Sequence, residues 1–410
     1  DLSRKNTPAL DWSRPESHET RVRRLGSGGV RLHRQIDATG YAVGLAWGPA
    51  ANWSQTAPHS FRLLPAGGAS HLEVVLAFSP SALPETLPSV DETLAASTES
   101  WPAFWSGGAA VDFSGSREPR AAELERRVVL SQYLTAVQMA GDVPPQETGL
   151  TCSSWYGKHH TEMIWWHVAH FALWGREAFV ENALEWYQRT LPGARQIAAS
   201  RGLMGARWPK MVGPEGRESP GGNPLIVWNQ PHPVALAELL YRAEPSRETL
   251  ERYQDLVLET AEGLSSMLHW VEAEQRYVLG PPLWISQEIH DPRKSMNPSF
   301  ELSYWGHALG LAQDWRERLG RKSSLEWDHI WEHLSDLPQK DGRYVALESV
   351  PDTFDNPLSR RDHPTMVAPL GLLPGFDVDP ATMRRTLDAV VATWDWEGKI
   401  WGWDYPMLAM

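Results

Sequence analysis

Three segments of this 410-residue sequence gather acids, histidines and tryptophans, and the third holds the residue best suited to acid catalysis. It spans residues 280–307 and contains Trp284, Glu288, His290 and Glu301. Cleavage of a glycosidic bond needs a carboxylic acid that stays protonated near neutral pH, and burial against an aromatic ring favours that form. Glu288 near Trp284 fits this requirement as a general acid. The alternative is a solvated acid in a loop.

Glu301 is the rival acid of the same segment. It begins the helix expected over residues 300–319, where the positive end of the helix dipole favours an ionised carboxylate. A role as a base, as a ligand for sugar hydroxyls or as an N-terminal cap therefore suits it better than a role as an acid.

The first segment, residues 151–170, combines four histidines, one acid and three tryptophans. Tryptophan rings stack on the C–H faces of a pyranose, and His or Glu side chains bind its hydroxyls. The residues that we expect to bind substrate here are Trp155, His159, His160 and Glu162. His167 and His170 have the i,i+3 spacing of metal ligands, but no further acid or histidine completes a zincin motif. We expect no metal and no cofactor.

The second segment comprises residues 205–211 and 228–233, two loops rich in glycine and proline. Its planar and hydrogen-bonding side chains suit a neutral polyol ligand. The candidate binding residues are Arg207, Trp208, Lys210, Trp228, Asn229, Gln230 and His232. The alternative is a pair of structural loops in which the two tryptophans fill the core, and the sequence leaves both interpretations open.

Composition narrows the classes of function. Lys plus Arg number 38 and Asp plus Glu 51, so the net charge is −13, and no stretch is basic enough for a nucleic-acid binder. The single cysteine, Cys152, excludes an internal disulfide framework and a multi-thiolate metal site. No run approaches the ~18 apolar residues of a membrane span. We expect a soluble protein, cytoplasmic or secreted, that binds an oligosaccharide or glycoside, and neither nucleic acid nor membrane.

Tryptophan is in excess, with 22 residues against 10 Tyr and 9 Phe. Those in or beside the three segments are Trp155, Trp165, Trp166, Trp208, Trp228, Trp284 and Trp305. Those on expected helices, which we assign to packing, include Trp186, Trp270, Trp315, Trp327 and Trp331. A last group receives no role: Trp394, Trp396, Trp401 and Trp403.

The elements that must position these residues change in kind along the chain. Residues 1–80 read as part of a β-sandwich-like domain, with strands expected at Val30–His33, Tyr41–Trp47, Ser60–Leu64 and His71–Phe78. Residues 81–119 are rich in Pro, Ser and Gly and are expected to form a linker. From 120 to 410 the apolar period becomes 3.6, which predicts a mainly α fold. The expected helices are 121–140, 161–173, 178–200, 233–242, 246–271, 300–319, 324–335 and 380–394.

Ordered motifs in the three segments resemble those of glycoside hydrolase family 65, in the six-hairpin glycosidase superfamily. That family includes maltose, trehalose and kojibiose phosphorylases and related α-glucosidases. Gly157–Met163 (GKHHTEM) is similar to the end of its G-H-x-F-W-D-x-E-x-F-M segment, and Gly205–Lys210 (GARWPK) to its G-A-R-[FY]-P-W segment. Its G-P-D-E-Y-H motif is matched by Gly280-Pro281 and, after an insertion, by Glu288-Ile289-His290.

The resemblance covers about residues 150–310 and implies an (α/α)6 toroid of helical hairpins after a β-sandwich, with the sugar bound at one mouth of the barrel. Glu288 matches the general acid of the family. Trp155 and Glu162 match positions that shape the subsite of the terminal sugar. His160 stands where Asp is usual, so the sugar need not be glucose.

The parent function that the resemblance implies is an inverting α-glycosidase. Family members carry the general base, or a phosphate-binding loop in its place, near the last hairpin. Fewer than twelve helices are expected before Met410, so we expect an incomplete toroid, a base beyond Met410 and little turnover by these residues alone. The alternatives are a phosphorylase of the same fold and a catalytically silent carbohydrate-binding protein. The sequence does not fix the oligomeric state and is compatible with a homodimer, and Asn52-Trp53-Ser54, a lone glycosylation sequon, leaves the location open.

Overall fold

The computed structural model describes residues 13–48, 51–139, 141–150, 154–219, 223–398 and 400–410. Cys152 lies outside the described residues. The chain divides into two compact units, whose described residues lie within 13–109 and 110–410. The division falls inside the segment 81–119 that the sequence marks as a linker.

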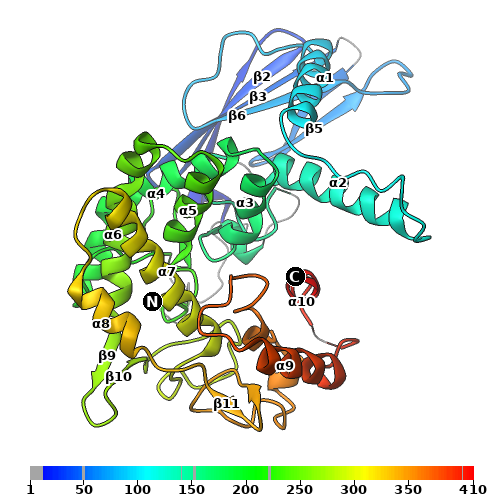
Figure 1. The fold of residues 1–410 in the computed structure, drawn as a ribbon. Coiled ribbons are helices and arrows are strands. Elements are labelled where there is room, and N and C mark those ends of the chain that lie inside the picture. The colour runs from blue at the N-terminus through cyan, green and yellow to red at the C-terminus, as the bar shows by residue number, and fades with distance from the viewer. Residues whose placement is uncertain (1–12, 49–50, 140, 151–153, 220–222, 399) are drawn as a thin grey trace. The chain divides into compact units, whose positions relative to one another are not determined.

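The smaller unit is built on antiparallel strands, drawn in blue in Figure 1. Its elements are β1 (His18–Arg24), β2 (Gly29–Ile36), β3 (Thr39–Trp47), β4 (Ala51–Ala57), β5 (Ser60–Pro65), β6 (Val74–Ser79) and α1 (Val90–Ser106). The order β1-β2-β3-β6 forms one sheet, and β4 pairs with β5 as a separate hairpin. The buried core of the unit comprises Val30, Leu32, Val43 and Trp47.

The sequence located β2, β3, β5 and β6 but neither β1 nor β4. The segment HETRVRR of β1 is mostly charged and lies at the edge of the sheet, so it lacks the apolar alternation that marks a half-buried strand. Helix α1 lies within the expected linker. It begins with a capping box in which the Ser89 side chain accepts from the Glu92 amide while Glu92 accepts from the Ser89 amide.

The larger unit is mainly helical. Its helices are α2 (Ala121–Gln138), α3 (Ile164–Leu173), α4 (Ala178–Ser200), α5 (His232–Ala243), α6 (Arg247–Ser266), α7 (Ser299–Arg318), α8 (Leu325–His333), α9 (Pro380–Thr393) and α10 (Asp404–Ala409). All eight helices expected from periodicity are present, and α10 lies where residues 404–410 read as the start of a further helix. The segment expected as a helix to residue 271 ends at Ser266, because residues 268–271 instead form a strand of the hairpin β9 (Leu268–Val271) and β10 (Arg276–Leu279).

Helices that alternate in sequence contact one another in space. Helix α5 packs against both α3 and α7, while α4 contacts α6, and each of these helices also contacts its neighbour in the chain (Figure 1). This is the arrangement of successive helical hairpins laid side by side in two layers. Helix α7 is buried along most of its length, which explains its lack of a clear polar face. Closure into a ring of six hairpins stays a prediction.

A two-residue ladder joins the first two chemical segments. Strand β7 (His159–His160) pairs with β8 (Met211–Val212), and the Thr161 amide donates to the carbonyl of Lys210 at 3.0 Å. The third segment reaches the same region through the backbone of Trp284, which donates to Leu225 at 2.8 Å. Backbone hydrogen bonds therefore hold together loops that lie far apart in the sequence.

The Gly-Ala-Arg loop sits tightly on α6, and two glycines allow this contact. Gly205 has a φ of +58°, and a Cβ there would lie 2.2 Å from the carbonyl oxygen of Glu259. A Cβ on Gly263, inside α6, would lie 2.1 Å from the carbonyl oxygen of Ala206. The loop that carries Lys210 is therefore positioned by a direct approach of backbone to backbone.

We expect Gly263→Ala to lower the free energy of unfolding by about 1–3 kcal/mol, because the added methyl group overlaps the Ala206 carbonyl. Gly193→Ala in α4 is the matched control, since a Cβ there has open space, and it should be neutral or stabilise by up to about 1 kcal/mol. Urea unfolding measures both changes. Equal stability of the two variants would contradict the close approach.

Candidate functional site

A cavity of 140 Å³ collects residues from all three chemical segments and from the end of the chain. Four of the predicted site residues line it, namely Trp155, Glu162, Lys210 and Glu288. The other lining residues were not predicted: Glu147, Met163, Ser286, Asp362, His363, Trp401 and Trp403. The cavity therefore combines carboxyl groups with indole rings.

Lys210 is the central cation of the cavity. Its Nζ lies 2.8 Å from Oε1 of Glu288 and 3.0 Å from Oε2 of Glu162, and its side chain is 4% exposed. Burial works to lower the pKa of Lys210, but the charges and hydrogen bonds of the two glutamates outweigh it, so the pKa is raised. The ammonium group also lies 5.5 Å from the centre of the Trp155 ring. One cation thus serves two carboxylates.

Glu162 is fixed from several sides. Trp228 donates from Nε1 to Oε1 of Glu162 at 2.9 Å, and His232 Nε2 lies 3.0 Å from its backbone carbonyl. His160 Nε2 lies 3.8 Å from Oε2. Burial lowers the pKa of both His160 and His232 to about 3, so these imidazoles are neutral and add no positive charge. They shape the wall behind Glu162.

Glu288 has polar surroundings. Asn223 donates from Nδ2 to Oε2 at 2.7 Å while Lys210 holds Oε1, and the side chain is 31% exposed. Trp284 does not line the cavity, so the apolar contact expected between the two is replaced by a cation and an amide. Glu288 is thus held in place with both oxygens engaged, at the surface of the cavity.

Two other carboxyl groups of the cavity have raised pKa values. Burial raises the pKa of Glu147, against the hydrogen bond that it accepts from Nε1 of Trp155. Burial likewise raises the pKa of Asp362, against the opposing effects of the His363 charge and backbone amide. In both carboxyl groups burial shifts the proton equilibrium toward the neutral form, beside a charged site.

His363 and Asp404 form a pair that the sequence did not reveal. His363 Nδ1 lies 2.8 Å from Oδ1 of the fully buried Asp404, whose Oδ2 accepts the Trp401 amide at 3.1 Å. The imidazole stacks on the Trp403 ring at 4.0 Å and 24°. The only sequence signals were the Asp-His-Pro run at 362–364 and the acid beside the last tryptophans.

Most of the remaining predicted site residues lie behind the cavity wall. Asn229 donates to Thr161 and to the Trp208 carbonyl, both at 2.9 Å, and Gln230 accepts from the Trp208 amide at 2.8 Å. Trp208 is itself 1% exposed. Trp208, Asn229 and Gln230 therefore stabilise the loops of the second segment, as the alternative interpretation of that segment proposed. Of the residues in this segment, Lys210 alone lines the cavity.

Three more of the predicted substrate-binding residues lie away from the cavity of Lys210. Arg207 donates to the Pro224 carbonyl and lines a separate cavity with residues 279–283. His290 pairs with Gln287 at 3.0 Å, and His159 bonds the Pro144 carbonyl. None of the three lines the cavity of Lys210.

Glu301 is buried within α7. It is 1% exposed, neither side-chain oxygen has a hydrogen-bond partner, and burial raises its pKa to about 8. It does not line the cavity, so the structure separates the rival acid from the other candidates. A neutral carboxyl inside the helical core is the form that burial favours.

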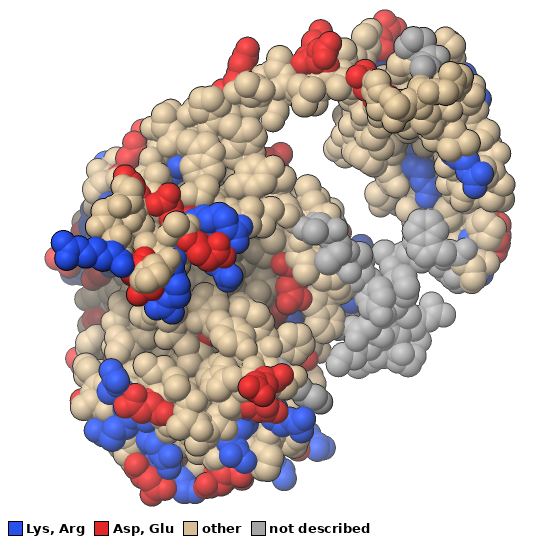
Figure 2. Space-filling view, turned by 90° about the vertical axis from the view of Figure 1, so that its right-hand side faces the viewer, with Lys and Arg blue, Asp and Glu red and all other residues tan. Residues whose placement is uncertain are grey.

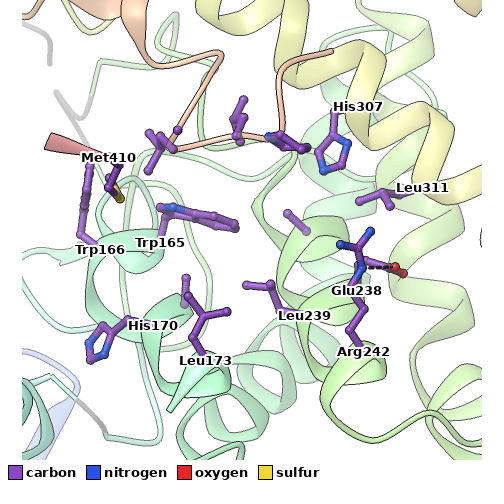
Figure 3. Close-up of a pocket in the computed structure, with 16 residues that line it drawn as sticks. Trp165, Trp166, His170, Leu173, Glu238, Leu239, Arg242, His307, Leu311 and Met410 are labelled. Atoms are coloured by element: carbon purple, nitrogen blue, oxygen red, sulfur yellow. Dashed lines mark hydrogen bonds and ion pairs between the residues drawn. The ribbon is translucent and has the colours of Figure 1, made fainter. Parts of the chain in front are cut away.

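A larger cavity of 310 Å³ lies between α3, α5 and α7, and Figure 3 shows Trp165 and His307 facing it. Its walls are mainly apolar and include none of the predicted site residues. Its one carboxyl, on Glu238, is paired with Arg242 at 2.7 Å and Arg318 at 2.6 Å. The smaller cavity, in contrast, has the carboxyl side chains of Glu147, Glu162, Glu288 and Asp362 in its wall.

The surface of the larger unit carries both signs of charge side by side in Figure 2. Arg252 on α6, for example, bridges to Glu181 and Glu185 on α4. Among the described residues, no three His, Cys, Asp or Glu side chains are grouped to hold a metal ion. Within the same residues, every helix is too short or too polar to cross a membrane.

Comparison with known proteins gives a likeness of fold. A solved structure titled "Putative kojibiose phosphorylase from human microbiome" superposes with a TM-score of 0.51 and 9% identity, over 83% of this chain and 49% of that chain. The chain thus spans about half the length of that protein. No protein-family model and no curated protein matches the sequence. The fold of the chain is therefore similar to that of this solved structure over the matched half, and the closed toroid stays a prediction.

We expect Lys210→Met to destabilise the protein by ~3–5 kcal/mol, because it leaves two carboxylates facing each other without their cation. Lys340→Met is the matched control. The Lys340 side chain is 41% exposed and its Nζ lies 3.6 Å from Asp355, which is 78% exposed, so its loss should change stability by less than ~1 kcal/mol. Urea unfolding at pH 7 distinguishes the two, and similar losses would contradict the central role of Lys210.

Stability should fall as the pH is lowered from 7 to 5. Burial lowers the folded-state pKa of His160, His167, His170, His232 and His307 from 6.5 to about 3 or 4. The unfolded chain therefore takes up protons in this window while the folded chain does not, at up to about 1.4 kcal/mol per pH unit for each histidine.

This pH dependence is measured by urea unfolding across the window. His307→Gln should flatten the dependence, since it removes one buried neutral imidazole. His269→Gln, at an exposed position, should leave it as in the wild type. A stability that is constant between pH 7 and 5 would refute the neutral state of the buried histidines.

Proposed function

We propose that the protein is a carbohydrate-active enzyme, an inverting glycoside hydrolase that binds the terminal sugar of an α-linked substrate in the cavity of Lys210. The observation that carries this proposal is the set of carboxyl groups facing a small cavity whose walls include the rings of Trp155, Trp401 and Trp403. Indole rings stack on sugar faces, and fixed carboxylates bind hydroxyls and transfer protons.

Glu288 is proposed as the general acid. It lies at the partly exposed edge of the cavity, where the leaving group of a longer substrate would extend. Protonation of Glu288 still leaves Lys210 paired with Glu162, so the neutral acid forms without exposing an unpaired buried charge. In the reaction Glu288 gives its proton to the glycosidic oxygen while water attacks the anomeric carbon from the opposite face.

Glu162 and Trp155 are proposed to hold the sugar itself. Trp228 holds one oxygen of the Glu162 carboxylate and Lys210 holds the other, so the carboxylate is fixed in one orientation. A hydroxyl acceptor that positions a sugar needs this rigidity. His160 stands beside it as a neutral ring. An imidazole in this place offers a different hydrogen-bonding pattern from a carboxylate, so the preferred sugar is left open to glucose and its epimers.

Water suits this cavity better than phosphate as the attacking group. Phosphate is a dianion near neutral pH and binds where cations or several free amides face it. Among the described lining residues the one lysine is already paired with two carboxylates, and Glu147 and Asp362 add further acid groups. Without a free ammonium or guanidinium group among these described lining residues, a bound dianion is disfavoured and hydrolysis is favoured.

Phosphorolysis is the second candidate, because the similar solved structure carries the name of a phosphorylase. Incubation of the chain with α-linked disaccharides, with and without inorganic phosphate, separates the two. A hydrolase releases free sugar at the same rate in both, whereas a phosphorylase forms a sugar 1-phosphate and depends on phosphate. Binding of sugars with no product under either condition would indicate a carbohydrate-binding protein without catalysis.

We expect Glu288→Gln to lower kcat on α-linked disaccharides by ~10²–10⁴-fold with a smaller change in KM, because it removes the proton donor but keeps the shape. Glu332→Gln, on the exposed side of α8, is the control and should keep the wild-type rate. Proton NMR of the first product gives its anomeric form, which is β for an inverting enzyme. Full activity of Glu288→Gln would eliminate Glu288 as the acid.

A further inference from the structure

We propose that the pair formed by His363 and Asp404 is the general base of the site, with Nε2 of His363 accepting a proton from the attacking water. This inference rests on the proposed glycoside hydrolysis and adds the residue that the acid alone does not supply. It places acid and base within the same described residues, whereas the resemblance led us to expect a base beyond Met410.

The tautomer of His363 is set by Asp404. The Asp404 carboxylate is fully buried and receives the Nδ1 side of the imidazole at 2.8 Å. A carboxylate can only accept, so Nδ1 carries the hydrogen, and in the neutral imidazole Nε2 carries the lone pair. The same logic of an acid that orients a basic imidazole operates in hydrolases that activate a hydroxyl or water.

The basic nitrogen lies near a second residue of the cavity wall. His363 lines the cavity, and Nε2 lies 3.8 Å from Oδ1 of Asp362, which also lines it. That separation is too long for a direct hydrogen bond. Stacking on the Trp403 ring at 4.0 Å fixes the plane of the imidazole, so Nε2 keeps one direction.

A single side chain connects the proposed base to the proposed acid. Gln287, next to Glu288, is fully buried and donates from Nε2 to the backbone carbonyl of His363. His290 holds the other end of the same amide at 3.0 Å. The loop with the acid and the segment with the base are therefore held in register across the cavity.

The proton balance of the step is complete with these groups. The water oxygen forms a bond to the anomeric carbon as the bond to the leaving oxygen breaks. The water proton goes to Nε2 of His363, and the proton of Glu288 goes to the leaving oxygen. Asp404 and Asp362 stabilise the imidazolium that forms. Solvent then carries one proton from His363 back to Glu288, so no other reactant is consumed.

The test uses α-glycosyl fluorides, whose leaving group needs little help from an acid. The 410-residue chain is assayed on the α-fluorides of glucose, galactose and mannose, as wild type, His363→Ala, Asp404→Asn and Glu288→Gln. We expect His363→Ala to lower kcat by ~10²–10⁴-fold and Asp404→Asn to lower it by ~10²-fold or more. Glu288→Gln should keep most of the fluoride activity. His269→Gln, at an exposed position, is the matched control.

Azide provides the readout that loss of structure cannot imitate. Azide attacks without a base, so it should restore turnover of His363→Ala and give the β-glycosyl azide. If the wild type is active and a folded His363→Ala variant turns over the fluorides at the same rate, the inference is overturned. The proposed function then still stands. Loss of activity in His363→Ala without azide rescue, beside full activity of Asp404→Asn, also overturns it.

Two further outcomes are decisive. If the wild type turns over none of the fluorides and none of the α-linked disaccharides, both the function and the inference are refuted. If thermal unfolding shows that His363→Ala does not fold, Asp404→Asn decides, since it keeps the volume and reverses the hydrogen bond. A fall in its kcat with an unchanged KM supports the base, and an unchanged kcat refutes it.

Discussion

The pairing of one buried ammonium group with two carboxylates is the interaction on which the rest of the site depends. Lys210 is 4% exposed, and an isolated charge at that depth would be strongly unfavourable. Glu162 and Glu288 come from loops 48 residues before and 78 residues after it in the sequence. Their need for a common cation holds all three loops at one cavity, and the ladder of β7 with β8 and the contact of Gly205 with α6 place the lysine where it can serve both.

Apolar periodicity in the sequence predicted the helices whose positions depend mainly on their own residues. Helices α4 and α9 appear close to where a period of 3.6 placed them, because an apolar stripe alone defines a helix that packs on one side. Strand β1 was missed because its position is set by pairing with β2 and hardly by its own apolar residues. Residue types in the second segment led to Lys210, and the resemblance to known motifs supported Glu162 and Glu288, three residues that the structure brings together.

The sequence did not predict the cavity residues that lie on irregular segments of the backbone. Asp362 and His363 lie between two short 3-10 turns, and Asp404 begins a six-residue helix 41 positions after His363. No periodicity joins such residues, so only the folded chain shows that they meet. Glu301 is the opposite case. Its place at a helix start suggested an ionised acid, but the helix is buried and neither oxygen of its carboxyl has a hydrogen-bond partner among the described residues. Desolvation outweighs the helix dipole there.

The tryptophans show how function and packing share one residue type. Trp186, Trp208, Trp228, Trp305 and Trp315 are fully buried, so three of the rings in or beside the three chemical segments (Trp208, Trp228 and Trp305) are core residues. Trp228 still acts on the site, because its indole nitrogen fixes Glu162. Trp401 and Trp403, to which the sequence gave no role, line the cavity and stack on His363. In the proposed mechanism, an indole ring that holds the imidazole in one plane helps to orient the nitrogen that accepts the proton. Such a ring supports the chemistry through apolar contact alone.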